Sequence, residues 1–118
     1  MPDRDGICPL EELIRLVGGK WKVMILWAVL KRPTRFGELR RQIPGVTQKM
    51  LTQQLRELER DGLMTRTVFA QVPPRVDYAP TPLAVRMGTL LKAMDRWARD
   101  NLPLAVAAPS NRAKPKRP

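Results

Sequence analysis

The sequence predicts a mainly helical fold of the α+β class, with one small β-hairpin. Two observations carry this prediction: two helical segments meet at a tight turn within residues 36–62, and residues 63–78 alternate in the manner of a hairpin. A long amphipathic segment follows from about residue 81. At 118 residues the chain is long enough for one domain. We expect that domain at residues 8–102, between a flexible N-terminus (1–7) and a disordered tail (103–118).

The first two helices differ in kind. Leu10, Leu13, Ile14 and Val17 recur at i, i+3, i+4 and i+7, which predicts an amphipathic helix that ends at Gly18-Gly19. The next helix, residues 20–30, is apolar on all sides from residue 23 onward, so we expect it to be enclosed on every side as the central core helix. Its eight apolar residues are too few to cross a bilayer, which needs about 20.

Residues 36–62 read as a short helix, a turn and a longer helix. Pro44 cannot continue the first of these helices because it lacks an N–H, and Gly45 supplies the backbone freedom for a reversal. Thr47 stands where its hydroxyl would cap the second helix. This pattern predicts a helix-turn-helix, and by spacing alone a plain antiparallel helix pair fits equally well.

The two sides of the longer helix carry different chemistry. Leu51, Leu55 and Leu58 form one apolar stripe that must face a core. On the opposite side lie Lys49, Gln53, Arg56 and Arg60, which we call the donor face. Thr52 lies at its edge. Glu57 and Glu59 fall to the sides. Long donors without an acid among them suit phosphates and base edges in a major groove, and the alternative is a solvated surface.

The segment after the longer helix favours the helix-turn-helix over the plain helix pair. Residues 63–69 are rich in β-branched side chains, residues 75–78 alternate, and Pro73-Pro74 belongs in the loop at 70–74 because proline cannot donate to a sheet. A helix-turn-helix followed by a basic hairpin predicts a winged helix. Arg66 and Arg75 would be the cations of the wing.

Charge supports a nucleic-acid partner. The chain has 22 Lys and Arg against 11 Asp and Glu, a formal charge of +11, and a pI near 11.1. Residues 31–75 alone contain ten basic and four acidic residues, a net charge of +6. Four further cations lie in the tail, which we interpret as a solubilising end rather than a DNA-gripping arm because no apolar anchor accompanies them: Arg112, Lys114, Lys116 and Arg117.

Several classes of function are disfavoured. The chain contains no histidine and one cysteine, so an intrachain disulfide is excluded and the usual zinc ligands and general base are absent. With no Gly-rich phosphate loop either, we expect no enzyme, no metal and no cofactor. No apolar run follows a basic start, so we expect no export signal, no membrane association and a cytoplasmic location.

The segment after the wing predicts a dimer. Met87, Leu90, Leu91, Met94, Trp97 and Ala98 recur at helical spacing, in a stripe longer than a small winged helix can cover. We therefore assign an interface between two copies to the first and last helices. Its residues are Leu10, Leu13, Ile14, Leu90, Leu91, Met94 and Trp97. The alternative, packing of the last helix on its own core, does not exclude the interface.

Separated blocks of the sequence resemble the HxlR-type winged helix-turn-helix regulators: residues 35–52, Leu55–Glu59, Asp61–Leu63, Val72–Tyr78, and upstream Cys8-Pro9 and Gly18–Trp21. The resemblance covers about residues 8–100. It implies a bacterial DNA-binding homodimer joined through its terminal helices, in which residues 48–60 read the operator. The chain departs from the family pattern at Pro80, where an aliphatic residue usually precedes the threonine, and at Ala84, so the exit from the second strand is expected to differ.

We therefore expect a homodimeric transcription regulator, a repressor, on a pseudopalindromic operator in double-stranded DNA. The recognition helix would contribute Thr47, Gln48, Lys49, Thr52, Gln53 and Arg56, with Thr52, Gln53 and Arg56 reading bases. Phosphates would be held by Lys49 and by the backbone and wing residues Arg35, Arg40, Arg41, Arg66 and Arg75. The alternative is a winged helix that binds RNA or protein, and the lack of aromatics on the donor face argues against RNA.

Cys8 is the candidate for a response to oxidants or to a small-molecule electrophile. It precedes Pro9, a favoured first-turn residue, so its sulfur would lie near a helix N-terminus, where the thiol pKa falls. Some members of the resembling family respond through a cysteine in this region. The alternative is a small apolar residue at the dimer interface.

Overall fold

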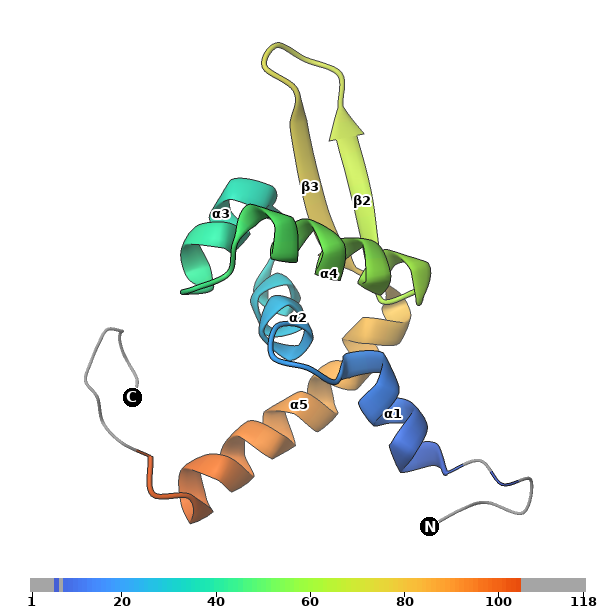
Figure 1. Cartoon of the computed structure of the whole chain (residues 1–118), viewed down its shortest axis with the longest axis vertical. Coiled ribbons are helices and arrows are strands. Elements are labelled where there is room, and N and C mark those ends of the chain that lie inside the picture. The colour runs from blue at the N-terminus through green and yellow to red at the C-terminus, as the bar shows by residue number, and fades with distance from the viewer. Residues whose placement is uncertain (1–5, 7, 105–118) are drawn as a thin grey trace. The chain divides into compact units, whose positions relative to one another are not determined.

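The computed structural model describes residue 6 and residues 8–104. Its elements in chain order are α1 (Pro9–Val17), α2 (Lys22–Lys31), β1 (Thr34–Arg35), α3 (Phe36–Gln42), α4 (Gln48–Arg60), β2 (Met64–Phe69), β3 (Arg75–Pro80) and α5 (Pro82–Asn101) (Figure 1). The chain divides after Gly88, inside α5, into two compact units. The first unit holds α1 to α4, the sheet and the first turns of α5. The flexible N-terminus and the basic tail expected at 1–7 and 103–118 fall almost wholly outside the described residues.

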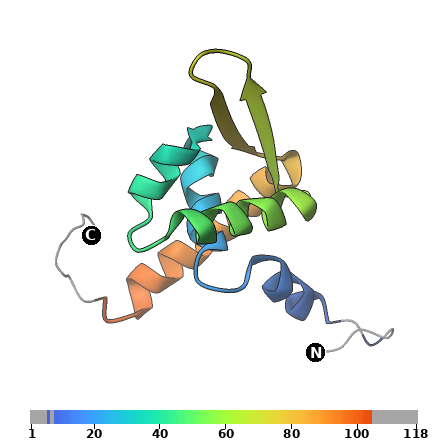
Figure 2. The same cartoon turned by 45° about the horizontal axis from the view of Figure 1, so that its top comes forward.

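The helix-turn-helix is formed by α3 and α4, as the sequence predicted (Figure 2). Gly45 makes the turn with φ +88°, a conformation that glycine adopts without steric cost. The Thr47 hydroxyl accepts the backbone N–H of Met50 at 3.1 Å, which confirms the predicted cap of α4.

The C-terminus of α4 closes on Gly62, whose φ is +78°. The N–H of Leu63 donates to the carbonyl of Leu58 at 2.9 Å, and the N–H of Gly62 donates to that of Glu59 at 3.1 Å. This is the Schellman arrangement, which satisfies carbonyls that a helix end leaves unpaired. It also turns the chain directly from α4 into the wing.

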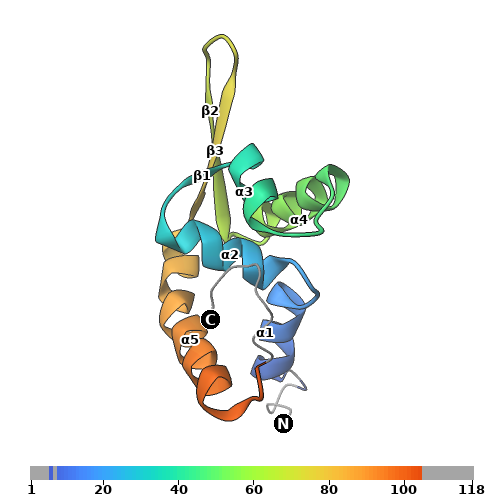
Figure 3. The same ribbon diagram turned by 90° about the vertical axis from the view of Figure 1, so that its left-hand side faces the viewer.

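The wing belongs to a three-stranded antiparallel sheet of order β1-β3-β2. β2 and β3 pair from Met64 opposite Pro80 to Phe69 opposite Arg75, and together they extend beyond the helices (Figure 3). The sequence did not predict β1, because two residues are too few to alternate. Thr34 pairs with Tyr78 and Arg35 with Asp77, which fixes the start of α3 beside the wing.

The core of the first unit lies between α2, α3 and α4. Leu51, Leu55 and Leu58 of α4 are all buried, as are Ile25, Leu26 and Val29 of α2, Leu39 of α3 and Ile43, which follows α3. The prediction that α2 is enclosed on every side is wrong at Met24, which is 41% exposed. A segment that is apolar on all sides predicts that the helix is mostly buried, but it does not show which side remains exposed to solvent.

The exit from β3 is made by Pro80 and Thr81. Pro80 is the last residue of β3, opposite Met64 of β2 and beyond the two residues of β3 that pair with β1. The Thr81 hydroxyl donates to the carbonyl of Gly62 at 2.6 Å and accepts the N–H of Ala84 at 3.3 Å. One side chain therefore caps α5 and ties its start to the end of α4.

None of the described helices combines the length and the apolar character that a membrane crossing requires.

The leucine stripe of α4 predicts a large loss of stability on truncation. We expect Leu55→Ala to lower the free energy of unfolding by about 2 to 5 kcal/mol, because the side chain is fully buried and leaves a cavity. Urea titration at one fixed protein concentration measures this. Met50→Ala on the same helix, at a 41% exposed site, serves as the control and should change stability by less than about 1 kcal/mol.

Candidate nucleic-acid interface

The outward side of α4 presents a row of hydrogen-bonding side chains. Gln48, Lys49, Gln53 and Arg56 are exposed, and Thr52 is half-buried beside them. These five residues line a shallow groove of about 540 Å³. Since Leu51, Leu55 and Leu58 hold the opposite side of α4 in the core, the donor face is fixed toward the exterior.

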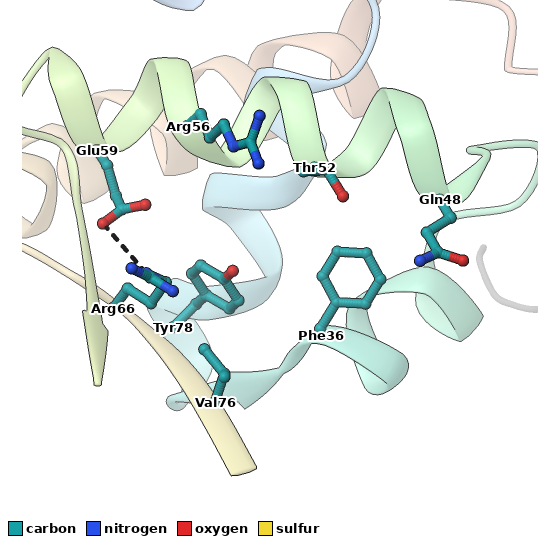
Figure 4. Close-up of a pocket in the computed structure, with 8 residues that line it drawn as sticks. All are labelled: Phe36, Gln48, Thr52, Arg56, Glu59, Arg66, Val76 and Tyr78. Carbon is teal, nitrogen blue, oxygen red and sulfur yellow. Dashed lines mark ion pairs between the residues drawn. The ribbon is translucent and has the colours of Figure 1, made fainter. Parts of the chain in front are cut away.

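A second concavity, here called the wing pocket, lies between α4 and the wing and has a volume of about 380 Å³ (Figure 4). It is lined by Phe36, Gln48, Thr52, Arg56, Glu59, Arg66, Val76 and Tyr78. Arg56 and Thr52 approach it from α4, and Phe36, Val76 and Tyr78 supply its apolar lining. The pocket is therefore lined both by Arg56, predicted to read a base, and by Arg66, predicted to bind a phosphate from the wing.

Sequence reasoning missed four residues of the wing pocket, namely Phe36, Glu59, Val76 and Tyr78. Tyr78 is buried, and this burial raises the pKa of its hydroxyl above the ordinary value. The alternation of β3 could have indicated its inward direction. The pairing of Thr34 with Tyr78, which brings Phe36 to the pocket, depends on the two-residue strand β1 and has no sequence signal of its own.

The cations assigned to the wing both have acidic neighbours. Arg66 Nε lies 3.7 Å from Glu59 Oε2. Arg75 Nε lies 3.3 Å from Asp77 Oδ1, and its guanidinium stacks 4.2 Å from the Phe69 ring centroid. Arg75 is therefore part of the wing's own packing, whereas Arg66, half exposed, is held by a single weak surface pair.

The remaining predicted cations divide into two groups. Arg41 lies 3.8 Å from Glu38 in an exposed pair, and Arg60 lies 3.3 Å from Asp61, whose side chain is only 14% exposed. Among the described residues, no ion pair involves Arg35, Arg40, Lys49 or Arg56. These four positive charges are the ones on this surface that an incoming polyanion would meet without displacing an acid.

One acid contacts a residue of the donor face. It is Glu57, which the sequence predicted to lie to the side of that face. Glu57 Oε2 accepts a hydrogen bond from Gln53 Nε2 at 3.3 Å, and Glu57 Oε1 lies 2.7 Å from the ammonium of Lys22 on α2. The hydrogen bond from Lys22, and next that from Gln53, lower the pKa of the Glu57 carboxyl below its ordinary value. Glu57 is therefore ionised and accepts only.

The residues predicted for a dimer interface are exposed in part. Within the first unit, Leu10 and Ile14 of α1 are 64% and 58% exposed, and Leu13 is half-buried. Within the second unit, Leu90, Met94 and Trp97 are exposed, the last at 60%, while Leu91 is buried. Five of the seven predicted residues thus present large apolar side chains to solvent, two in the first unit and three in the second.

Cys8 is the N-cap residue of α1 and is half-buried. Its carbonyl accepts the N–H of Glu12 at 3.0 Å. The backbone N–H of Glu11, in the first turn, lowers the pKa of the Cys8 thiol below its ordinary value because it stabilises the thiolate. Pro9 at the first helical position is as the sequence predicted.

Comparison with known proteins places this geometry among transcription regulators. Residues 16–105 match the model of the HxlR-like helix-turn-helix family. YybR of Bacillus subtilis (strain 168), an uncharacterised HTH-type transcriptional regulator, is 39% identical over 110 residues, which cover 93% of this chain and 87% of YybR. These proteins are regulators and not enzymes.

Solved structures agree. The redox regulator HypR in its reduced form is 40% identical, with a TM-score of 0.77 over 80% of this chain and 93% of HypR. The reduced form of the transcriptional regulator YodB from B. subtilis is 31% identical, with a TM-score of 0.72 over 82% of this chain and 96% of YodB.

Proposed function

This chain belongs to the HxlR-like helix-turn-helix family of transcription regulators, and from that premise we propose that it is a homodimeric repressor of a pseudopalindromic operator in duplex DNA. The observation that carries the proposal is the donor face of α4, exposed and backed by buried leucines. A helix so presented enters a major groove with its side chains at the base edges.

Under this proposal some of the exposed side chains recognise the base sequence, and others bind the phosphates and so raise affinity for any sequence. Arg56 has no ion pair within the described residues and is long enough to reach a guanine with two hydrogen bonds. Gln53 and Thr52 lie on the same side of α4 one turn earlier. Lys49, Arg35 and Arg40, also without acidic neighbours in the described part of the chain, bind phosphates. Together they give both a sequence-dependent and a salt-dependent component of binding.

The wing adds a second contact to the DNA backbone. Arg66 lines the wing pocket beside Arg56, and its exposed pair with Glu59 is weak enough for a phosphate to replace. Arg75 and Arg41, each beside an acid, contribute positive potential around the same surface. We propose that α4 and the wing bind the same DNA duplex. We also propose that the protein acts in the cytoplasm.

Dimerisation accounts for the exposed apolar side chains of α1 and α5, among them Leu10, Ile14, Met94 and Trp97. One recognition helix makes few base contacts, and two such helices about 34 to 36 Å apart read the two halves of a palindrome. A small dimer that occupies its operator regulates most directly by excluding other proteins from it, which is repression.

A second function, a response to oxidants or electrophiles, is favoured by Cys8. Its lowered thiol pKa increases the reactive thiolate fraction. The similar protein HypR is a redox regulator whose reduced and oxidised forms are both solved. We propose that modification of Cys8, at the start of a helix assigned to the dimer interface, releases this chain from its operator.

Removing Arg56 or Lys49 separates base reading from phosphate binding. We expect Arg56→Ala to weaken operator binding by about 1 to 3 kcal/mol and to relax preference at one position. Lys49→Ala should weaken binding to all sequences alike and reduce the salt slope by about one. Fluorescence anisotropy from low to moderate salt measures both, with an operator selected from bound genomic fragments.

The control for these variants is Arg15→Ala, which removes one cation from α1, outside the helix-turn-helix and the wing. Its binding should match that of the wild type. Failure of the wild-type protein to bind any duplex at low salt, or binding of single-stranded RNA in preference, would reject the proposed function in favour of the RNA-binding or protein-binding alternative.

Charging the apolar surface tests the dimer. Ile14→Glu and Trp97→Glu each place a carboxylate where we propose an apolar interface, so each should weaken the dimer by about 2 kcal/mol or more. Sedimentation velocity over a concentration series gives the association constant. Val68→Glu, an equally exposed apolar position on β2, is the matched control and should remain dimeric; a wild-type monomer at all concentrations would contradict the proposal.

Cys8→Ser tests the redox response. Treatment with a quinone or with peroxide should release the wild-type protein from its operator and leave binding by Cys8→Ser unchanged. Mass spectrometry of the treated proteins identifies the modified residue. Equal release of both proteins would remove Cys8 as the sensor and leave operator binding itself unaffected.

A further inference from the structure

Lys22 lies at a position where a positive charge is energetically unfavourable. It is the first residue of α2, beside the positive end of the helix dipole, and its side chain is only 8% exposed. The first turn of α2 contains no acid to offset this. Its partner is Glu57 on α4, 35 positions later in the chain, at 2.7 Å.

Stability alone does not explain this ion pair. Moving two charges out of water costs about as much as their attraction returns, and apolar residues of similar size often serve equally well. Glu57 is still 26% exposed, and its second oxygen reaches outward to the amide of Gln53. The pair thus connects the buried side of α4 to a residue on its donor face.

The consequence for Gln53 is a fixed amide orientation. A carboxylate only accepts hydrogen bonds, so the nitrogen end of the amide must face Glu57 and the oxygen end must point away. The Gln53 oxygen and its second N–H then remain for the DNA. An acceptor next to a donor is the pattern that complements N6 and N7 of adenine in the major groove.

We propose that Lys22 and Glu57 are positioning residues that orient the Gln53 amide to read an adenine in each operator half-site. The inference rests on the proposed function and adds to it the identity of one base and the residues that select it. Within the described part of the chain, Lys49 and Arg56 have no comparable hydrogen-bonded support on the donor face. Gln53 is therefore the reader whose geometry is set before DNA arrives, so the ordering cost at binding is reduced.

The test compares the wild-type protein with four single variants and one double variant on a set of operators that carry each of the four base pairs at each position. Gln53→Ala identifies the position that Gln53 reads, which should be A·T in the selected operator. Glu57→Gln should lower the preference for adenine over guanine at that position roughly tenfold, the size of a bidentate base contact. The reason is that a glutamine at 57 can donate as well as accept, so the Gln53 amide can turn over.

Lys22→Met should act in the same direction by a smaller factor, because the carboxylate stays but loses its anchor. Glu12→Gln is the matched control: it also neutralises an acid in an ion pair, with Arg15 on α1, and should leave every base preference unchanged. Preferences at all positions other than that of Gln53 should be unchanged in all variants. A merely structural role would weaken binding to every operator alike.

Folding is controlled separately. Thermal unfolding is recorded for each variant, and Lys22→Met/Glu57→Gln removes both charges together, so that no buried charge is left without a partner. This double variant should fold and show the same roughly tenfold loss as Glu57→Gln.

Two results would overturn the inference while leaving the proposed function intact: Gln53→Ala changes preference at a position that is not A·T, or Glu57→Gln and the double variant retain the wild-type preference there. Loss of specific binding by the wild-type protein would instead reject the proposed function.

Discussion

The contact of α4 with α2, made with Leu51, Leu55 and Leu58 of α4 buried, is the constraint on which the rest of the structure depends. Each of these side chains is buried, and burial of a leucine stabilises the fold by about 1.5 to 3 kcal/mol. Because helical residues three and four apart share a side, fixing the leucines inward fixes the donor face outward. The same contact holds Glu57 beside Lys22, so the core of α4 and the chemistry of its surface are set by one interface.

Positive charge is abundant in this chain but unevenly available. Arg41, Arg66 and Arg75 lie next to acids, and Arg75 also stacks on Phe69, whereas Lys49 and Arg56 on the donor face have no ion pair within the described residues. Acids beside the peripheral cations reduce the attraction of the surface for any polyanion. The cations without an ion pair in the described residues are among those that we propose contact DNA, Arg56 at a base and Lys49, Arg35 and Arg40 at phosphates.

Much of this structure could be predicted from the sequence, because local chemistry determines it. The periodicity of the leucines, the Thr47 cap, the turn at Gly45 and the Pro73-Pro74 loop each act within a few residues. What escaped prediction depends on distant segments. The strand β1 exists only through its pairing with Tyr78, and the wing pocket follows from that pairing. The contact from Lys22 to Glu57 spans 35 positions, and no helical repeat reveals it.

Thr81 links the helix-turn-helix, which we propose binds DNA, to the helix that we assign to dimer contacts. Its hydroxyl donates to the Gly62 carbonyl at the end of α4 and accepts the Ala84 N–H at the start of α5. With one atom engaged by both helix ends, a rotation of the first turn of α5 strains or breaks the bond to Gly62. The Thr81 N–H also donates to the Leu63 carbonyl at 3.3 Å, so a displacement at the start of α5 acts on the end of α4 through both the side chain and the backbone of one residue.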